Sequence, residues 1–149
     1  MLRKLIQSLF ILLLIVGCEE NLIEEVKERY DSGEPNLVEY YKNSVDPKNL
    51  VRKRKYFPDG EIFTEENYKN GIKHGKHTLF YGNVNRQIHI EFNYKDGKTD
   101  GLGNSYYLNG ILESKVNYKD GEKDGNSTYY NKDGSISKVE EWKEGKLVE

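Results

Sequence analysis

The residues that could do chemistry in this 149-residue chain are three histidines, a set of acidic turns and one cysteine. The histidines are His74, His77 and His89, and a carboxylate such as Glu91 could join them at a metal ion. Zinc sites need three or four convergent ligands in fixed geometry. The alternation of side chains along residues 87–94 places His89 on the polar side of an expected strand. We therefore expect solvated histidines, no metal site and no cofactor.

The acidic turns are the second candidate for chemistry. Residues 96–101 read DGKTDG and residues 120–126 read DGEKDGN, which brings carboxylates together as a calcium site would. The EF-hand loop needs oxygen ligands at alternate positions and a distant glutamate, and neither stretch has that spacing. Asp-Gly pairs are also residues that tight turns require. No carboxylate pair is set apart for acid and base roles, and the chain has no G-x-S-x-G motif or phosphate-binding loop, so we predict that it is not an enzyme.

The cysteine follows a stretch with the layout of a secretory signal peptide. Positive residues at 3 and 4 precede a largely apolar run over residues 5–16. A bilayer-spanning helix needs roughly 20 apolar residues, so this run is too short. The run ends Ile15-Val16-Gly17-Cys18, which resembles the lipobox of bacterial lipoproteins.

The lipobox resemblance implies diacylglycerol on the sulfur of Cys18, cleavage before it and acylation of the new amino terminus. Several acyl chains anchor a protein permanently, because each buried CH₂ contributes about 0.8 kcal/mol and one chain alone binds only marginally. We therefore expect residues 1–17 to be a lipoprotein signal peptide. Glu19 follows the cysteine, which favours the outer membrane, at its periplasmic face or at the surface. The alternatives are an ordinary signal peptide cleaved nearby, or an N-terminal anchor with a chance cysteine.

Composition limits the kinds of partner. The formal charge of −2 becomes −4 without the signal peptide, because 21 Lys and Arg then face 25 Asp and Glu. A mildly acidic chain gives no electrostatic case for binding nucleic acid. Tyrosine, glycine and charged residues are abundant while leucine and alanine are few, so there is little material for a thick core. A thin or elongated single domain is expected.

A repeat must position these residues. Tyr68, Tyr94, Tyr118 and Trp142 recur at spacings of 26, 24 and 24, and each is followed three residues later by glycine. A second aromatic column, which precedes the first in each unit, has spacings of 24, 26 and 24, so two extra residues lie within residues 81–87. Its members are Tyr56, Phe80, Tyr106 and Tyr130. Asn-Gly or Asp-Gly pairs separate the strands, and such pairs favour two-residue hairpin turns. Each unit is thus predicted to be a β-hairpin, joined to the next by a similar turn.

Side chains alternate between two sides in the central units, one mostly apolar and the other polar, as strands require. The corresponding positions of the outer units are more polar, which is typical of the ends of a stacked repeat. We expect a linker over residues 18–27, a degenerate unit over 28–50, and repeats over about 51–75, 76–101, 102–125 and 126–149. Leu22 to Arg29 has helical spacing as an alternative, so the lead-in is expected to be helix or coil.

The unit Tyr-Lys-Asp-Gly, two variable residues, Asp-Gly, an aromatic pair and Asn-Gly resembles the MORN repeat. It is most similar to the bacterial variant in the YwqK-like toxin–antitoxin antitoxin family, many members of which are lipoproteins. The resemblance covers roughly residues 50–149, and it begins at residue 28 if the degenerate unit is included. It implies an all-β fold, an open antiparallel single-layer β-meander of repeated hairpins.

The aromatic column before each turn is the candidate ligand platform, because exposed aromatic side chains favour protein or glycan contacts. Structural cross-strand pairing is the alternative. We expect a lipid-anchored, non-catalytic envelope scaffold that binds another protein or an envelope polymer. The alternative is an antitoxin or immunity-type protein that neutralises a toxin or effector by direct binding. The platform candidates are Tyr56, Phe80, Tyr106 and Tyr130, with the neighbouring Tyr81 and Tyr107.

Overall fold

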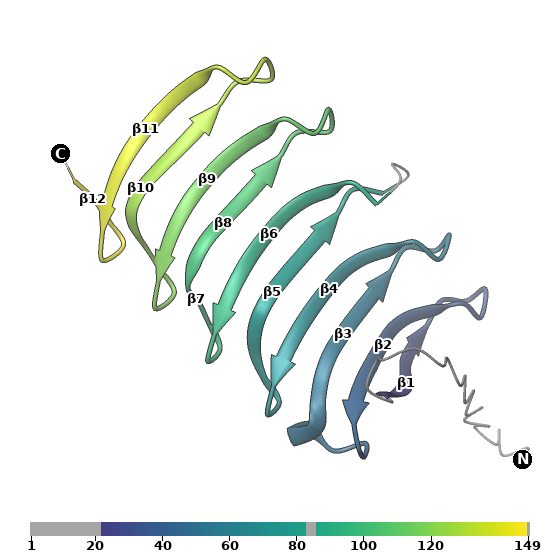
Figure 1. The fold of residues 1–149 in the computed structure, drawn as a ribbon. Coiled ribbons are helices and arrows are strands. Elements are labelled where there is room, and N and C mark those ends of the chain that lie inside the picture. The colour runs from purple at the N-terminus through teal and green to yellow at the C-terminus, as the bar shows by residue number, and fades with distance from the viewer. Residues whose placement is uncertain (1–21, 83–85, 149) are drawn as a thin grey trace, which may run out of the picture.

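The computed structural model describes residues 22–82 and 86–148, so the predicted signal peptide and Cys18 lie outside the described residues. The described chain forms one open antiparallel sheet, which confirms the all-β meander (Figure 1). Each strand pairs with the next along the chain, except near β7. The short β7 pairs only with β6, and β6 also pairs with β8 along the same edge. The strands are β1 (Leu22–Arg29), β2 (Pro35–Lys42), β3 (Leu50–Tyr56), β4 (Ile62–Lys69), β5 (Ile72–Phe80), β6 (Ile88–Lys95), β7 (Lys98–Thr99), β8 (Gly101–Tyr106), β9 (Leu112–Lys119), β10 (Glu122–Tyr130), β11 (Ile136–Lys143) and β12 (Lys146–Leu147).

The sheet is a single layer. In Figure 1 the strands lie side by side as bowed rungs, with β1 and β12 at opposite ends. Over the described ranges the buried apolar side chains are only Val38, Tyr40, Tyr41, Leu50 and Val116. The one helical turn there is the 3₁₀ segment η1 (Pro47–Asn49). None of the described segments is a helix with the length and apolarity needed to cross a bilayer.

The turns at the two ends of the strands are of different kinds. At one end, two-residue turns such as Asp96-Gly97 have positive φ at both residues, as predicted for Asn-Gly and Asp-Gly. At the other end, Gly60 N–H donates to the Phe57 carbonyl and Phe57 N–H donates to the Glu61 carbonyl. That pattern is a type I turn followed by a glycine in the left-handed region. The prediction of two-residue turns is therefore wrong at this end.

The turn between β5 and β6 is longer than its counterparts. Tyr81 N–H donates to the Gln87 carbonyl, where the other units close their turns over two fewer residues. This confirms the location of the insertion. Arg86, with φ of 57°, takes the left-handed position that glycine holds in the other units.

The N-terminal segment is a strand, and the helical alternative for Leu22–Arg29 is wrong. β1 pairs with β2 along its length, with Val26 opposite Val38, so cross-strand pairing overrides the helical spacing of the sequence. The sheet begins at Leu22, inside the segment expected to be a linker. Gly33 N–H donates to the Tyr30 carbonyl, the same turn as in the later units, so the degenerate unit is a hairpin.

Gly75, Gly101 and Gly125 lie in strands and not in turns, so the interpretation of residues 96–101 and 120–126 wholly as turns is wrong at their second glycines. They have positive φ inside or at the start of a strand, and Gly75 and Gly125 lie where the pairing shifts register. An asparagine side chain spans each irregularity by donating to a backbone carbonyl across the pair. These bonds run from Asn67 to Lys76 at 2.7 Å, from Asn93 to Leu102 at 3.1 Å and from Asn117 to Asn126 at 2.8 Å.

Candidate functional site

The second set of platform residues, Tyr81 and Tyr107, is used inside the sheet. The Tyr81 hydroxyl donates to the Tyr106 carbonyl at 2.7 Å, and the Tyr107 hydroxyl donates to the Tyr130 carbonyl at 2.8 Å. Tyr30 makes the same bond to the Tyr56 carbonyl at 2.6 Å. Each tyrosine therefore joins its own hairpin to the next one along the chain. Phe57 occupies this position in its unit and packs against Phe63, with ring centroids 4.9 Å apart.

Tyr107→Phe is expected to lower the free energy of unfolding by about 1 kcal/mol, because it removes one hydrogen bond and leaves the Tyr130 carbonyl unpaired. Thermal or urea unfolding of the full chain measures the change. Tyr130→Phe is the matched control, because the described residues offer its hydroxyl no hydrogen-bond partner. Equal losses in the two variants would contradict a joining role for Tyr107.

The first set of platform residues is half-buried and varied in its contacts. The Tyr56 hydroxyl lies 3.0 Å from the Tyr40 hydroxyl, and the Tyr106 hydroxyl donates to Glu91 at 3.0 Å. The Arg86 guanidinium lies 5.7 Å from the Phe80 ring centre. Glu91 also accepts from Lys76 and Asn104, so Tyr106 belongs to a polar cluster on this face. The six candidates do not form one continuous exposed stripe.

A different row of rings follows one face of the sheet. Cross-strand pairing puts the aromatic repeat column on the same face as His77 and Val116, and on the opposite face from Glu91 and Lys115. This repeat column consists of Tyr68, Tyr94, Tyr118 and Trp142. Lysine ammonium groups lie over four rings of this row at 4.4–5.8 Å from their centres, a favourable cation–π arrangement. We call these the ring–lysine row: Lys27 with Tyr41, Lys53 with Tyr68, Lys73 with Tyr94 and Lys123 with Trp142.

Sequence reasoning used Tyr68, Tyr94 and Trp142 of this row as markers of the repeat and missed them as a surface. A signal was present, because aromatic residues at the spacing of whole hairpins must share a face. The lysines gave no such signal, since they come from varying distances along the chain. The remaining ring of the repeat column, Tyr118, packs edge-on against Phe92 with centroids 5.7 Å apart.

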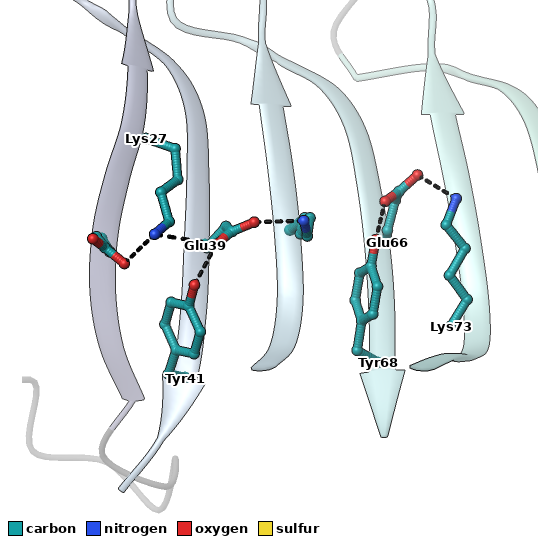
Figure 2. Close-up of polar contacts among 8 residues, drawn as sticks. Lys27, Glu39, Tyr41, Glu66, Tyr68 and Lys73 are labelled. Carbon is teal, nitrogen blue, oxygen red and sulfur yellow. Dashed lines mark hydrogen bonds and ion pairs between the residues drawn. The ribbon is translucent and has the colours of Figure 1, made fainter. Parts of the chain in front are cut away.

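One buried and one half-buried carboxylate, Glu39 and Glu66, link the side chains of the N-terminal half of the row, as Figure 2 shows. Glu39, only 8 % exposed, accepts a hydrogen bond from the Tyr41 hydroxyl and pairs with Lys53 Nζ at 2.5 Å and Lys27 Nζ at 3.6 Å. Burial raises the pKa of Glu39, but the bonds from Lys53 and Tyr41 outweigh it and leave the pKa below its ordinary value. Burial, with the bond to Glu39, raises the pKa of Tyr41 to about 12.

Glu66 repeats this arrangement one hairpin later. It accepts from the Tyr68 hydroxyl at 2.5 Å and pairs with Lys73 Nζ at 2.9 Å (Figure 2). Burial raises the pKa of Glu66, and the bonds from Tyr68 and Lys73 lower it further than burial raises it. In the two central units the equivalent positions are Phe92 and Val116, and Val116 is 6 % exposed. The row is therefore apolar beneath its centre and ionic towards its N-terminal end.

Acid should destabilise the sheet through these carboxylates. Because the pKa of Glu39 in the folded chain lies below the ordinary value of 4.5, its contribution is present above that pH and is lost as pH falls through the folded pKa. The free energy of unfolding should therefore drop on acidification below pH 4.5, and Glu39→Gln should flatten that drop. Glu61→Gln, at an exposed turn position, should keep the wild-type profile. Urea unfolding between pH 6 and pH 3 measures both, and parallel profiles for the wild type and Glu39→Gln would contradict this account.

The histidines are not brought together. His74 Nδ1 lies 3.4 Å from Asp96, His77 stacks on Tyr94 at 5.7 Å between centroids, and His89 stacks on Tyr81 at 4.2 Å. Across residues 22–82 and 86–148, no three His, Cys, Asp or Glu side chains are grouped so that they could hold a metal ion. Asp124, from one of the acidic turns, accepts a hydrogen bond from Glu144 N–H at 3.2 Å. That aspartate therefore stabilises the neighbouring turn.

Comparison with known proteins gives a structural neighbour and no family. No protein-family model matches the sequence, and no curated protein matches it. Among solved structures, a crystal structure of a mutant of S. aureus TarM, in complex with fondaparinux, alpha-GlcNAc-glycerol and UDP, aligns with a TM-score of 0.40 and 13 % identity. The alignment covers 86 % of this chain, which spans 21 % of the length of that one.

Proposed function

We propose that this chain is a lipid-anchored, non-catalytic lipoprotein of the bacterial cell envelope, whose MORN-like repeat sheet is a binding scaffold. The anchor rests on the Ile15-Val16-Gly17-Cys18 sequence after an apolar run. The likeness to bacterial MORN-repeat lipoproteins rests on the hairpin unit and its glycine columns. The partner is another protein or an envelope polymer just outside the membrane.

The observation that carries the scaffold proposal is the ring–lysine row. Neighbouring strands lie about 4.8 Å apart, so rings one hairpin apart are separated by roughly 10 Å. From Tyr68 to Trp142, an extended ligand laid across the strands would meet an aromatic ring at each such step, and an ammonium group at every ring except Tyr118. Aromatic faces and cations suit sugar rings, acidic groups and the side chains of a protein partner. Tyr41 is buried, whereas the other rings of this face are partly exposed, so the surface offered to such a ligand extends from β4 to β11.

Binding tests of face variants separate this surface from the rest of the sheet. Membrane extracts and purified peptidoglycan are offered to the immobilised full chain, and Lys73→Ala and Lys123→Ala should each reduce capture severalfold. Lys115→Ala is the matched control, because this lysine lies on the opposite face of the sheet. Capture that is unchanged in the row variants would contradict the proposal.

The same experiment weighs the platform predicted from sequence. Tyr106→Ala and Tyr130→Ala should weaken capture more than they lower the melting temperature if these rings contact the ligand. A loss of stability with unchanged capture would make them structural. A single tight partner with the properties of a toxin or secreted effector would instead favour the antitoxin or immunity function.

A further inference from the structure

We propose that copies of this chain join head to tail, with β1 of one copy added to the free edge of β11 of another. The proposal depends on the two ends of the sheet and not on the lipid anchor or on the ligand of the ring–lysine row. The partner it names is a second copy of the chain.

The edge of β11 is open over most of its length. β12 pairs only with Trp142 and Lys143, and Val148 N–H then donates to the Glu141 carbonyl at 2.8 Å. Within the described residues, no strand pairs with Ile136 to Glu140 on the side of β11 that faces away from β10. The equivalent strands β4, β6 and β9 each have a neighbour on both sides. Unpaired N–H and C=O groups at such an edge are a template for another strand.

The two ends of the sheet are complementary in phase. Two kinds of strand alternate along the sheet. The first kind leads into the longer turn that ends in a left-handed glycine, or into its extended version after β5. The second kind leads into a two-residue turn or, after β2, into a longer loop. The strand that should follow β11 in the sheet is of the first kind, and β12 is only a two-residue start of such a strand. β1 is a strand of this first kind, because it leads into the Tyr30 to Gly33 turn. The next strand that the repeat requires after β11 is therefore of the kind found at the other end of the same chain.

Side chains match when the register of β9 with β10 is transferred to this junction. In that register Ser114 faces Tyr129 and Lys115 faces Thr128. Lys138 and Val139 of β11 are equivalent to Ser114 and Lys115 of β9, because they pair with the same two residues of β10. Glu28 and Val26 of β1 are equivalent to Tyr129 and Thr128 of β10, because they pair with the corresponding positions of β2. Lys27, which lies between them, is the extra residue of a bulge.

The junction thus sets Lys138 against Glu28 and Val139 against Val26. Both valines are exposed in the single chain, at 57 % for Val139 and 38 % for Val26. Opposite charges and apolar pairs across strands contribute about 0.2–1 kcal/mol each. Glu25 faces Glu140 at the next position, and each already has its own lysine, Lys27 at 2.6 Å and Lys138 at 2.7 Å.

A contact between two different edges does not close on itself, so it produces open chains of copies whose length rises with concentration. The interface is small, and association is expected to be weak in dilute solution. Confinement of many copies to one surface would raise their effective concentration and favour it.

Cysteine cross-linking tests the register directly. Full-length chains carrying Cys18→Ser with either Val26→Cys or Val139→Cys are oxidised separately and as a mixture. The mixture should give a disulfide-linked dimer in about tenfold higher yield than either variant alone, because only the mixture brings the two thiols face to face. Leu108→Cys replaces Val139→Cys in the control, because Leu108 is equally exposed, at 56 %, but lies in a turn. Equal yields with Leu108→Cys would overturn the proposal.

Edge-blocking variants give a second, independent readout by light scattering. Val26→Lys and Val139→Lys each block one end and, at exposed positions, should change stability little. Each should be monomeric alone, while their mixture should form dimers and nothing larger, and the unmodified edges should form a concentration-dependent series. Monomers at all concentrations for the unmodified chain would overturn the proposal, as would β11 pairing with a different protein in its place.

Discussion

Cys18→Ser is expected to release the chain from membranes and to abolish its labelling by a palmitate analogue. A thioether to diacylglycerol requires the sulfur, and serine cannot form it. Each buried CH₂ of an acyl chain contributes about 0.8 kcal/mol, so removal of the lipid removes far more binding free energy than the rest of the chain can replace. Metabolic labelling and fractionation of cells expressing the full chain measure the two effects.

A displaced cysteine is the control for this change. Leu108→Cys in the Cys18→Ser background restores a thiol at an exposed turn but not at the end of the apolar run, so labelling and membrane binding should stay absent. If the Cys18→Ser chain remains on membranes, the apolar run itself holds it there, as an N-terminal anchor would.

Gly71→Ala is expected to be among the most destabilising small substitutions in the sheet, at about 2–4 kcal/mol. Gly71 has φ of +75°, where a side chain costs about 1–2 kcal/mol. A Cβ here would also lie 2.4 Å from the Pro47 carbonyl oxygen. That oxygen is held in place because it accepts a hydrogen bond from Leu50 N–H at the end of η1, so relief of the clash requires movement of backbone.

Gly60→Ala isolates the two causes. Gly60 has φ of +86°, and a Cβ there would have no atom within 4 Å. It should therefore show only the cost of the left-handed backbone, about 1–2 kcal/mol, and the excess in Gly71→Ala measures the contact with η1. Thermal unfolding of both variants makes the comparison. Equal losses would mean that the turn and η1 do not pack as described.

Much of the fold was predictable because its determinants are local. Asp96-Gly97 and its equivalents require positive φ, and the alternation of residues 87–94 requires a strand, whatever surrounds them. The predictions were wrong where one residue pair, Asp-Gly, is compatible with more than one local structure. Asp59-Gly60 looks like a two-residue turn but sits in a longer one, and Asp124-Gly125 looks like a turn but is a bulge in a strand.

The candidate site was less predictable. The sequence could mark Tyr81 and Tyr107 as aromatic, but their hydroxyls are committed to carbonyls in the following hairpin, at positions set by register. The ionic cluster around Glu39 draws lysines from two neighbouring strands. No spacing along the chain marks such a cluster, because its members meet only when the strands pair.

By itself, the sequence determined the hairpin repeat, its phase, the site of the insertion and a single-layer sheet, because turns and alternation are properties of a few neighbouring residues. Only the tertiary structure decided that Leu22–Arg29 is a strand, which rings join hairpins and which form the ring–lysine row. Those outcomes depend on which strands pair and in what register. Pairing is a relation between segments about one repeat apart, and a one-residue shift would reverse the face of every side chain.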